Sequence, residues 1–328
     1  ISYNNIIYQI LFFYDKLVQR PKMIRKILIP IIIIFITLFS IYVLKLIFFK
    51  PFSFNHFLSR QFIVNTLDSP ESLTYIGLLE KYGYRSYNGK LSDYSLEKDI
   101  KDLKKLKREY KILNSYQNEN LSPDELTSKK IAQFQMKNEI EQRTKYPYHA
   151  YPLIQINGLH TQIIEFMTDI HPIRDEKDGK YYLARLEKIP EVFNQIFEKL
   201  EKRKQLKIFP PIFMVERVIN QIENIIDIPV KENPLLIIYE KKLSSAGIET
   251  KTINILKEKA ERIIAEKVLP SYQLLLMHLH EIRPKANISH GVWSLPDGEN
   301  YYSLRLRIMT TSNYSPEEIH NIGLNEVE

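Results

Sequence analysis

The sequence predicts an all-α protein in which a membrane-spanning helix precedes a large helical domain. Three observations favour this class: an 18-residue apolar run without charge, apolar residues that recur every three or four positions along most of the remaining chain, and only nine glycines in 328 residues. A turn-rich β fold needs more glycine, and strand-like alternation is scarce. The one weak strand candidate is Leu235 to Tyr239.

The apolar run extends from Ile27 to Leu44 and resumes after Lys45 as far as Phe49. At about 1.5 Å per residue it spans roughly 27 to 35 Å, which is enough for a bilayer core. Pro30 falls in the first turn of the expected helix, where its missing N–H removes no hydrogen bond. Lys45 is close enough to the end for its ammonium group to reach the interface. A single membrane-spanning helix is therefore expected.

Basic residues flank the run unequally. They are Lys16, Arg20, Lys22, Arg25 and Lys26 before it, together with the acid Asp15, and Lys45, Lys50 and Arg60 after it. Because basic flanks tend to stay on the cytoplasmic side, this bias places the amino terminus in the cytoplasm and the main domain outside it.

A cleaved signal peptide and a buried core helix are the alternatives to an uncleaved anchor. The run is longer than a usual signal-peptide apolar region, and the residues that follow, Phe-Phe-Lys-Pro-Phe, contain no small-x-small cleavage site. The sequence therefore favours a transmembrane signal anchor over residues 23–50. Met23 is the expected start residue, and residues 1–22 would be an upstream extension or a cytoplasmic tail.

Residues 51–328 are expected to form one helical domain. Three helix starts combine a Ser N-cap with a Pro in the first turn: Ser69-Pro70, Ser122-Pro123 and Ser315-Pro316. A Glu three residues after Ser completes a capping box in the last two. Apolar residues at helical spacing predict further helices over 96–113, 182–200, 253–268 and 272–279. The clearest surface loop is Asp175–Gly179.

Charge and cysteine content exclude several classes of function. The net charge is +7, but Lys and Arg are interspersed with Asp and Glu, which does not favour nucleic-acid binding. Without cysteine, disulfides, thiolate metal sites, a cysteine nucleophile and a lipidated cysteine are excluded. The motifs GxGxxG, GxxxxGKS/T and GxSxG are absent.

Two stretches combine histidine with acids. His280 and Glu281 do not start a zinc-binding HExxH motif, because its fifth position is Pro284. His278 and His280 face different sides of a helix, so one packed and one exposed histidine are expected. The second stretch could offer oxygen ligands to a hard cation, but its spacing fits no calcium loop and favours a solvated helix–loop junction. It contains Asp169, His171, Asp175, Glu176 and Asp178.

Residues 291–327 contain the densest group of candidate site residues. A Pro-Asp-Gly turn precedes an expected helix, on which Tyr301 and Arg305 share a face and Tyr302 is offset by about 100°. A phenol and a guanidinium on one face suit recognition of a carboxylate or an oxyanion, and an interfacial tyrosine with a surface arginine is the alternative. His320, one turn into the last helix, is either a polar site residue or a packing residue.

Four stretches, in this order, carry a resemblance: LIQINGLHTQIIEFMTDIHP at 153–172, YYLARLEKIPEVFNQIFEKL at 181–200, Pro210-Pro211 with Val215-Glu216-Arg217, and 291–327 with its LPDG, YY, TT and SPEEIHNIGLNEV elements. From about Ser69 onward the chain resembles the bacterial family known as domain of unknown function 885 (DUF885). Each motif is weak by itself, and their order along most of the chain makes the resemblance specific.

The resemblance implies a large multi-helix zincin-like domain, a membrane or lipid anchor, and zinc-dependent hydrolysis, with peptides as the substrate class. It also implies a His-Glu-x-x-Pro-Gly-His-His motif after the GLNEV-like element, in which two histidines bind zinc and the glutamate activates water. This chain lacks that motif, so no zinc ligand, metal site or catalytic residue is assigned in it. The resemblance places Tyr301, Tyr302, Arg305 and His320 as substrate-cleft candidates.

Two functions remain open. The chain is either a fragment of a membrane-anchored zinc metallohydrolase of peptidase type, inactive by itself and with zinc bound only in the full-length protein, or a non-enzymatic membrane-tethered helical binding or scaffold domain. A start at Ile1 and an end at Glu328, soon after the last capping box, suggest truncation. The expected partners are the lipid bilayer and, in the full-length protein, a peptide substrate.

Overall fold

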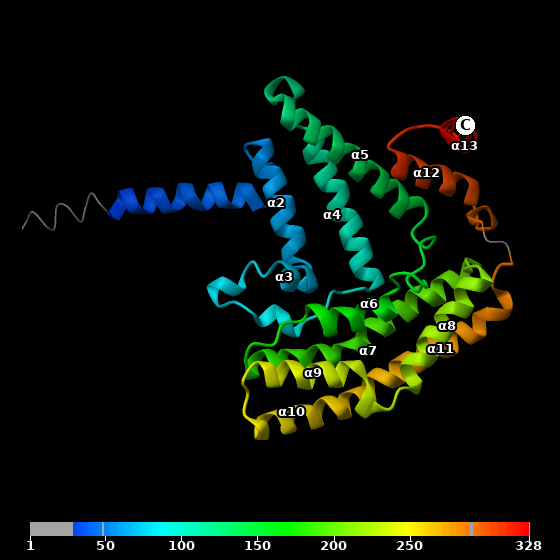
Figure 1. Cartoon of the computed structure of the whole chain (residues 1–328). Helices are drawn as coiled ribbons and strands as arrows, with labels where there is room; N and C mark the ends of the chain where they lie inside the picture. The colour runs from blue at the N-terminus through cyan, green and yellow to red at the C-terminus, as the bar shows by residue number, and fades with distance from the viewer. Residues whose placement is uncertain (1–28, 48, 289–290, 328) are drawn as a thin grey trace, which may run out of the picture. The chain divides into compact units, whose positions relative to one another are not determined.

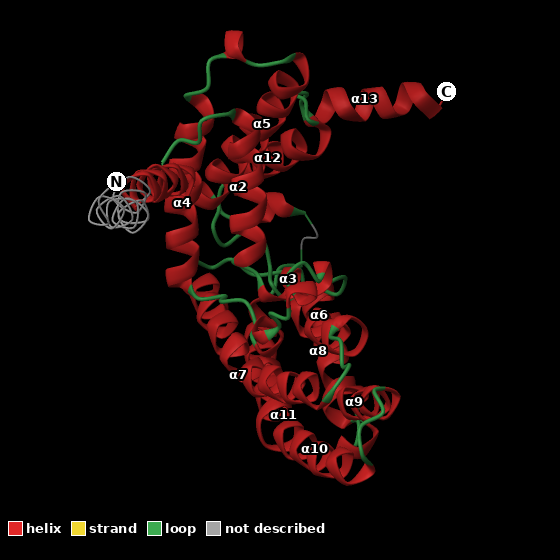
Figure 2. Ribbon diagram, turned by 90° about the vertical axis from the view of Figure 1, so that its left-hand side faces the viewer, coloured by secondary structure: helices red, strands yellow, loops and turns green. Residues whose placement is uncertain are grey.

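The computed structural model describes residues 29–47, 49–288 and 291–327, and the proposed extension 1–22 and start at Met23 lie outside these residues. The chain divides into two units, Ile1–Phe62 and Ile63–Glu328. All named elements of the described residues are helical (Figures 1 and 2). The all-α class is therefore confirmed.

The first unit contains one helix, Ile29–Ile47, that is long and apolar enough to cross a membrane. Its side chains are almost all exposed within the unit, as expected of a helix whose surroundings are lipid. The amide of Phe49 donates to the carbonyl of Lys45, and the chain then turns at the buried Pro51. Helix α2 (Phe54–Leu67) begins in this unit and continues past its boundary.

The second unit begins with short helices and one long hairpin. Helix α3 (Pro70–Ile76) is followed by the 3₁₀ turns η1 (Glu80–Tyr82) and η2 (Ser86–Gly89), and α4 (Leu96–Asn114) pairs with α5 (Pro123–Lys145) across η3 (Asn118–Asn120) (Figure 1). The hydroxyl of Ser69 accepts the amide of Ser72, and Ser122 forms a complete capping box with Glu125. Both predicted helix starts are confirmed.

The core of this unit is built around one long helix, α7 (Glu176–Gln205). It packs against α9 (Pro234–Ser245), α10 (Thr250–Ile263) and α11 (Leu269–Ile282). Its buried residues recur at helical spacing, as predicted, and each large one contributes about 1.5 to 3 kcal/mol. They include Tyr182, Leu186, Ile189, Phe193, Ile196 and Leu200.

Two sequence predictions about this region are wrong. Asp175–Gly179 is not a surface loop: Asp175 is the N-cap of α7, and Asp178 and Gly179 are buried in its first turn. A Cβ at Gly179 would lie 2.8 Å from the Leu243 side chain, so close helix packing explains this glycine. Leu235–Tyr239 is not a strand but belongs to α9, whose N-cap is Asn233.

Two π-helical segments interrupt the regular ladder. The segment η4 (Phe166–Ile170) ends α6 (Leu159–Glu165), and η6 (Ile264–Val268) joins α10 to α11. In η6 the amide of Leu269 donates to the carbonyl of Ile264, five residues earlier. Pro270 follows directly, and the shifted ladder accommodates its missing N–H.

The remaining elements lead from the core to the last helices. Helix α8 (Ile212–Asp227) packs on α11, the turn η5 (Val230–Glu232) precedes α9, and η7 (Arg283–Lys285) and η8 (Val292–Ser294) follow α11. Helix α12 (Gly298–Thr310) packs on α5. Helix α13 (Pro316–Val327) has the predicted capping box between Ser315 and Glu318 but no buried residue.

Candidate functional site

The Leu-Pro-Asp-Gly element attaches the start of α12 to the end of α5. Asp297 has a left-handed backbone with φ of 53°, and its carboxylate accepts a hydrogen bond from the Tyr146 hydroxyl at 2.7 Å. His149 Nε2 donates to the carbonyl of Pro296 at 2.7 Å. Gly298 leaves no room for a side chain, because a Cβ would lie 2.0 Å from a backbone carbonyl oxygen. The turn predicted from sequence is therefore also a docking element.

Tyr301 lies beneath this turn in a small aromatic cluster. Its ring centroid is 5.3 Å from that of Tyr146 and 4.9 Å from that of His149. Burial raises the pKa of Tyr301, and burial together with the bond to Asp297 raises the pKa of Tyr146 to about 12. Both phenols are therefore protonated at neutral pH, so they can donate or accept hydrogen bonds but cannot act as phenolate bases.

Arg305 lies one turn after Tyr301 and also faces α5. Its guanidinium donates to the side-chain oxygen of Gln142 at 3.2 Å, and it forms no ion pair within the described residues. Arg307, by contrast, is paired with Glu141 and donates to Asn138. Arg305 is therefore a partly buried cation that no carboxylate neutralises in the described part of the chain, which suits an anionic ligand.

The other two candidates are separate from this pair. Tyr302 points away from the cluster, with 41% of its surface exposed. His320 is exposed on α13, and among the described residues no hydrogen bond or ring contact joins it to α12. The structure thus brings together Tyr301 and Arg305, whereas Tyr302 and His320 could act only on a ligand or a protein segment that reaches both helices.

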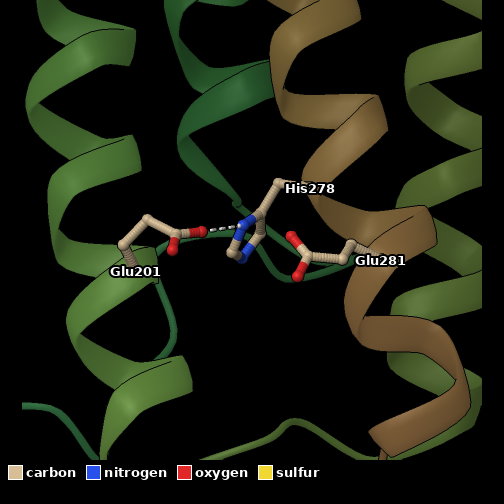
Figure 3. A group of neighbouring side chains, drawn as sticks. All are labelled: Glu201, His278 and Glu281. Carbon is tan, nitrogen blue, oxygen red and sulfur yellow. Dashed lines mark hydrogen bonds and ion pairs between the residues drawn. The ribbon is translucent and has the colours of Figure 1, made fainter.

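A second group, shown in Figure 3, combines two carboxylates with one histidine. Glu201 on α7 and His278 and Glu281 on α11 offer ligand atoms that lie within 4.8 Å of one another. His278 Nδ1 is 2.9 Å from the Glu201 carboxylate, and burial lowers the pKa of His278. The sequence missed this group because its members come from two helices 77 positions apart. As predicted, His278 is packed and His280 is exposed.

The group does not fit a zinc centre. The ammonium group of Lys204 lies 3.0 Å from Glu201 and 2.7 Å from Glu281, so a cation already bridges the two carboxylates. A metal ion would have to displace it against charge repulsion. The bond to Lys204 also lowers the pKa of Glu281. We therefore interpret the group as a helix-to-helix ion cluster and assign no metal to it.

The acidic stretch near the start of α7 is also structural, and the expected solvated junction is wrong for its central residues. Asp178 is fully buried and accepts hydrogen bonds from Arg85 at 3.1 Å and from Arg174 at 2.7 Å. His171 is fully buried as well, and its Nδ1 accepts a hydrogen bond from Arg185 at 2.7 Å. Arg174 within the stretch and the distant Arg85 both pair with Asp178, so we interpret the stretch as structural.

A cavity of about 200 Å³ lies between α3, α6 and α7, with Glu71, Ser92 and Tyr94 among its lining residues. The Glu71 carboxylate accepts both the amide and the hydroxyl of Ser92, and burial raises the pKa of Tyr94 to about 12. Both oxygens of the Glu71 carboxylate are therefore engaged by Ser92, and we assign no catalytic role to this cavity.

Comparison with known proteins agrees with the resemblance seen in the sequence. A family model described as "Bacterial protein of unknown function (DUF885)" matches residues 70–328. The crystal structure of "the putative lipoprotein from Colwellia psychrerythraea" has a similar fold, with a TM-score of 0.71 and 18% identity over 80% of this chain and 47% of that chain. The chain thus spans less than half of that structure's length. No curated protein gives a significant match.

Proposed function

The chain belongs to the DUF885 family, and from this premise we propose that it is the supporting half of a membrane-anchored zinc hydrolase that acts on peptides. The zinc ligands and the catalytic base belong, in this proposal, to a second half of the domain. The single observation that carries it is the fold match, which covers 80% of this chain but only 47% of the solved relative.

The absence of a suitable metal site in the described part of the chain supports this division. The one group of three metal-ligating side chains found there is bridged by Lys204. The zinc-binding motif HExxH is also absent from the sequence. In this proposal, the hydrolytic activity comes from residues outside this chain.

The last helices offer a surface for that second half. Large apolar side chains are exposed on the last helices and on the residues just before them, as expected of a surface that another part of the protein covers. They are Ile288, Trp293, Tyr302, Met309, Tyr314, Ile322, Leu324 and Val327, each at least 41% exposed. Docking there would bring Tyr302, Arg305 and His320 to the border between the halves, where they would line the cleft.

The proposal is tested by expressing the complete reading frame and, separately, the 328-residue chain. The complete protein should bind about one zinc per chain, cleave members of a peptide library followed by mass spectrometry, and lose activity with a chelator. The 328-residue chain should neither bind zinc nor cleave the peptides. As a control, His278→Ala in the complete protein should leave zinc content unchanged.

A complete protein that binds no zinc and cleaves no peptide would support the alternative, a membrane-tethered helical scaffold. The observation that favours this alternative is that the central carboxylates of both acidic groups already pair with basic side chains: Asp178 with Arg85, and Glu201 and Glu281 with Lys204. Zinc that disappears in the His278→Ala variant would overturn the placement of the metal in the second half.

A further inference from the structure

The end of the apolar helix is capped by a side chain from the next helix. The last carbonyl groups of any helix lack partners within it. Here Arg60 on α2 donates from Nη1 to the carbonyl of Leu46, at 3.3 Å, and to that of Phe49. Arg60 is only 7% exposed. The chain therefore turns at this point, and these bonds join α2 to the end of the helix that precedes it.

Aromatic rings cover the outside of the same corner. The rings of Tyr42 and Phe52 are stacked, with centroids 5.5 Å apart and planes 6° apart. The ammonium group of Lys45 lies 3.9 Å from the centre of the Phe52 ring, and the His56 ring meets Tyr42 edge-on at 6.4 Å. Phe49 and Phe52 nevertheless remain 64% and 56% exposed, so the corner presents apolar rings beside cations.

We propose that residues 42–47 and 49–60 form an interfacial elbow that is seated in the phospholipid headgroup layer. The exposed rings of Tyr42, Phe49 and Phe52 would lie at the boundary with the acyl chains, and the ammonium group of Lys45 would face lipid phosphates. Aromatic rings with nearby lysines are typical of this layer. The elbow rests on the proposed membrane anchor and extends it to a defined lipid contact.

The sequence of the elbow agrees with retention of the apolar helix. Cleavage by a signal peptidase requires small residues after the apolar region, and residues 49–52 are Phe-Lys-Pro-Phe. In a retained helix, the bonds from Arg60 to the carbonyl groups of Leu46 and Phe49 would hold the start of α2 against the end of the apolar helix.

Depth-dependent fluorescence quenching tests the lipid contact. The full chain, with Trp293→Phe to remove background, receives one probe, Phe52→Trp, and is reconstituted in phosphatidylcholine–phosphatidylglycerol vesicles containing lipids brominated either near the headgroup or deep in the acyl chain. We expect blue-shifted emission that the shallow bromines quench most. Ile36→Trp, in the middle of the apolar helix, should respond most to deep bromines, and Tyr75→Trp, at a position 75% exposed in the second unit, to neither.

Vesicle flotation separates the two proposals. If the chain floats but the Phe52→Trp probe behaves like Tyr75→Trp, the elbow is overturned and the anchor stands. If the chain does not float, both are overturned.

Arg60→Gln should leave flotation intact but make amide exchange around residues 49–53 about tenfold faster, since one hydrogen-bonded cap is lost. Arg283→Gln, which removes an exposed ion pair with Glu216, should not change that exchange, and equal exchange in both variants would refute the capping role.

Discussion

Asp178 shows how one buried carboxylate can join distant parts of the sequence. It is fully buried, and Arg85 and Arg174 both donate to it. Asp178→Asn removes the charge and leaves both guanidinium groups partly uncompensated, so we expect the free energy of unfolding to fall by about 3 to 5 kcal/mol. Chemical denaturation of the full chain in detergent micelles measures this change.

A matched control lies two residues earlier on the same helix. Glu176→Gln removes a carboxylate from an exposed ion pair with Lys180, and it should lower stability by no more than about 1 kcal/mol. Equal losses in the two variants would mean that Asp178 is not buried with its arginines as the structure shows.

His171 gives the stability a defined pH dependence. Burial, and then the neighbouring charge of Arg185, lower its pKa well below the ordinary value. The folded state therefore stays unprotonated while the unfolded state takes up a proton below about pH 6.5, so stability is present above that pH and is lost as pH falls. Unfolding measured at steps from pH 7 to pH 5 should show a falling free energy, with a smaller slope in His171→Gln.

The slope of His171→Gln should not vanish, because burial also lowers the pKa of His160 and of His278. The carboxylates with lowered pKa values, such as Glu80 and Glu141, lose stability only at more acidic pH. An unchanged slope in His171→Gln would show that His171 is accessible to protons in the folded state.

At the residue scale, sequence predicted local pairings and missed distant ones. Spacing alone separated the packed His278 from the exposed His280, and Ser-Pro pairs located helix starts. The environment of Asp178 depends on Arg85, 93 positions away, which no local pattern encodes. The prediction of a loop at Asp175–Gly179 was wrong although the sequence contained a helix-start signal. Asp175 is an N-cap residue type, and a second Asp follows it three positions later.

The attachment of α12 to α5 depends on a single glycine at the start of the helix. In Gly298→Ala the new Cβ would approach a backbone carbonyl to 2.0 Å, so the turn has to shift and the bond between Tyr146 and Asp297 is strained. We expect a loss of about 1 to 3 kcal/mol in stability. Because Trp293 adjoins Gly298 and is the only tryptophan, its emission should shift as well.

Gly323 is the control for the same substitution. It lies within α13, where a Cβ would meet nothing within 4 Å, so Gly323→Ala should be neutral or stabilise the helix by up to about 1 kcal/mol. A Gly298→Ala variant as stable as Gly323→Ala would show that the close approach at the α12 start does not exist.

At the element scale, helical periodicity predicted the helices correctly wherever a helix has one solvent-exposed and one buried face. It predicted α4, α7, α10 and α11 for that reason. It failed for α9, because the five apolar residues 235–239 are too short a run to distinguish a buried helix from a strand. The Asn233-Pro234 pair was the missed signal, as an N-cap followed by proline in the first turn.

At the scale of the whole molecule, the family resemblance implied that the metal site lies outside this chain, and this stays a prediction. Tyr301, Tyr302 and Arg305 were expected on one helix, and α12 carries all three. They line a cleft only in the proposal, in which a second half covers α12 and α13. The exposed apolar side chains of these helices support the proposed border between the halves.

This border leads to a last prediction, on association between copies of the chain. Met309 on α12 and Met277 on α11 are 73% and 69% exposed, so replacing either by lysine removes little buried surface and should leave stability unchanged. If the surface of α12 and α13 is built to be covered, single chains held in nanodiscs should associate through it, as light scattering at rising concentration would show. Met309→Lys should weaken that association at least about tenfold, because a methionine that gains burial on docking contributes about 1.5 to 3 kcal/mol, whereas Met277→Lys should not. Equal association in the two lysine variants would mean that α12 and α13 are an ordinary solvent-facing surface, and the proposal of a second half docked there would lose its structural support.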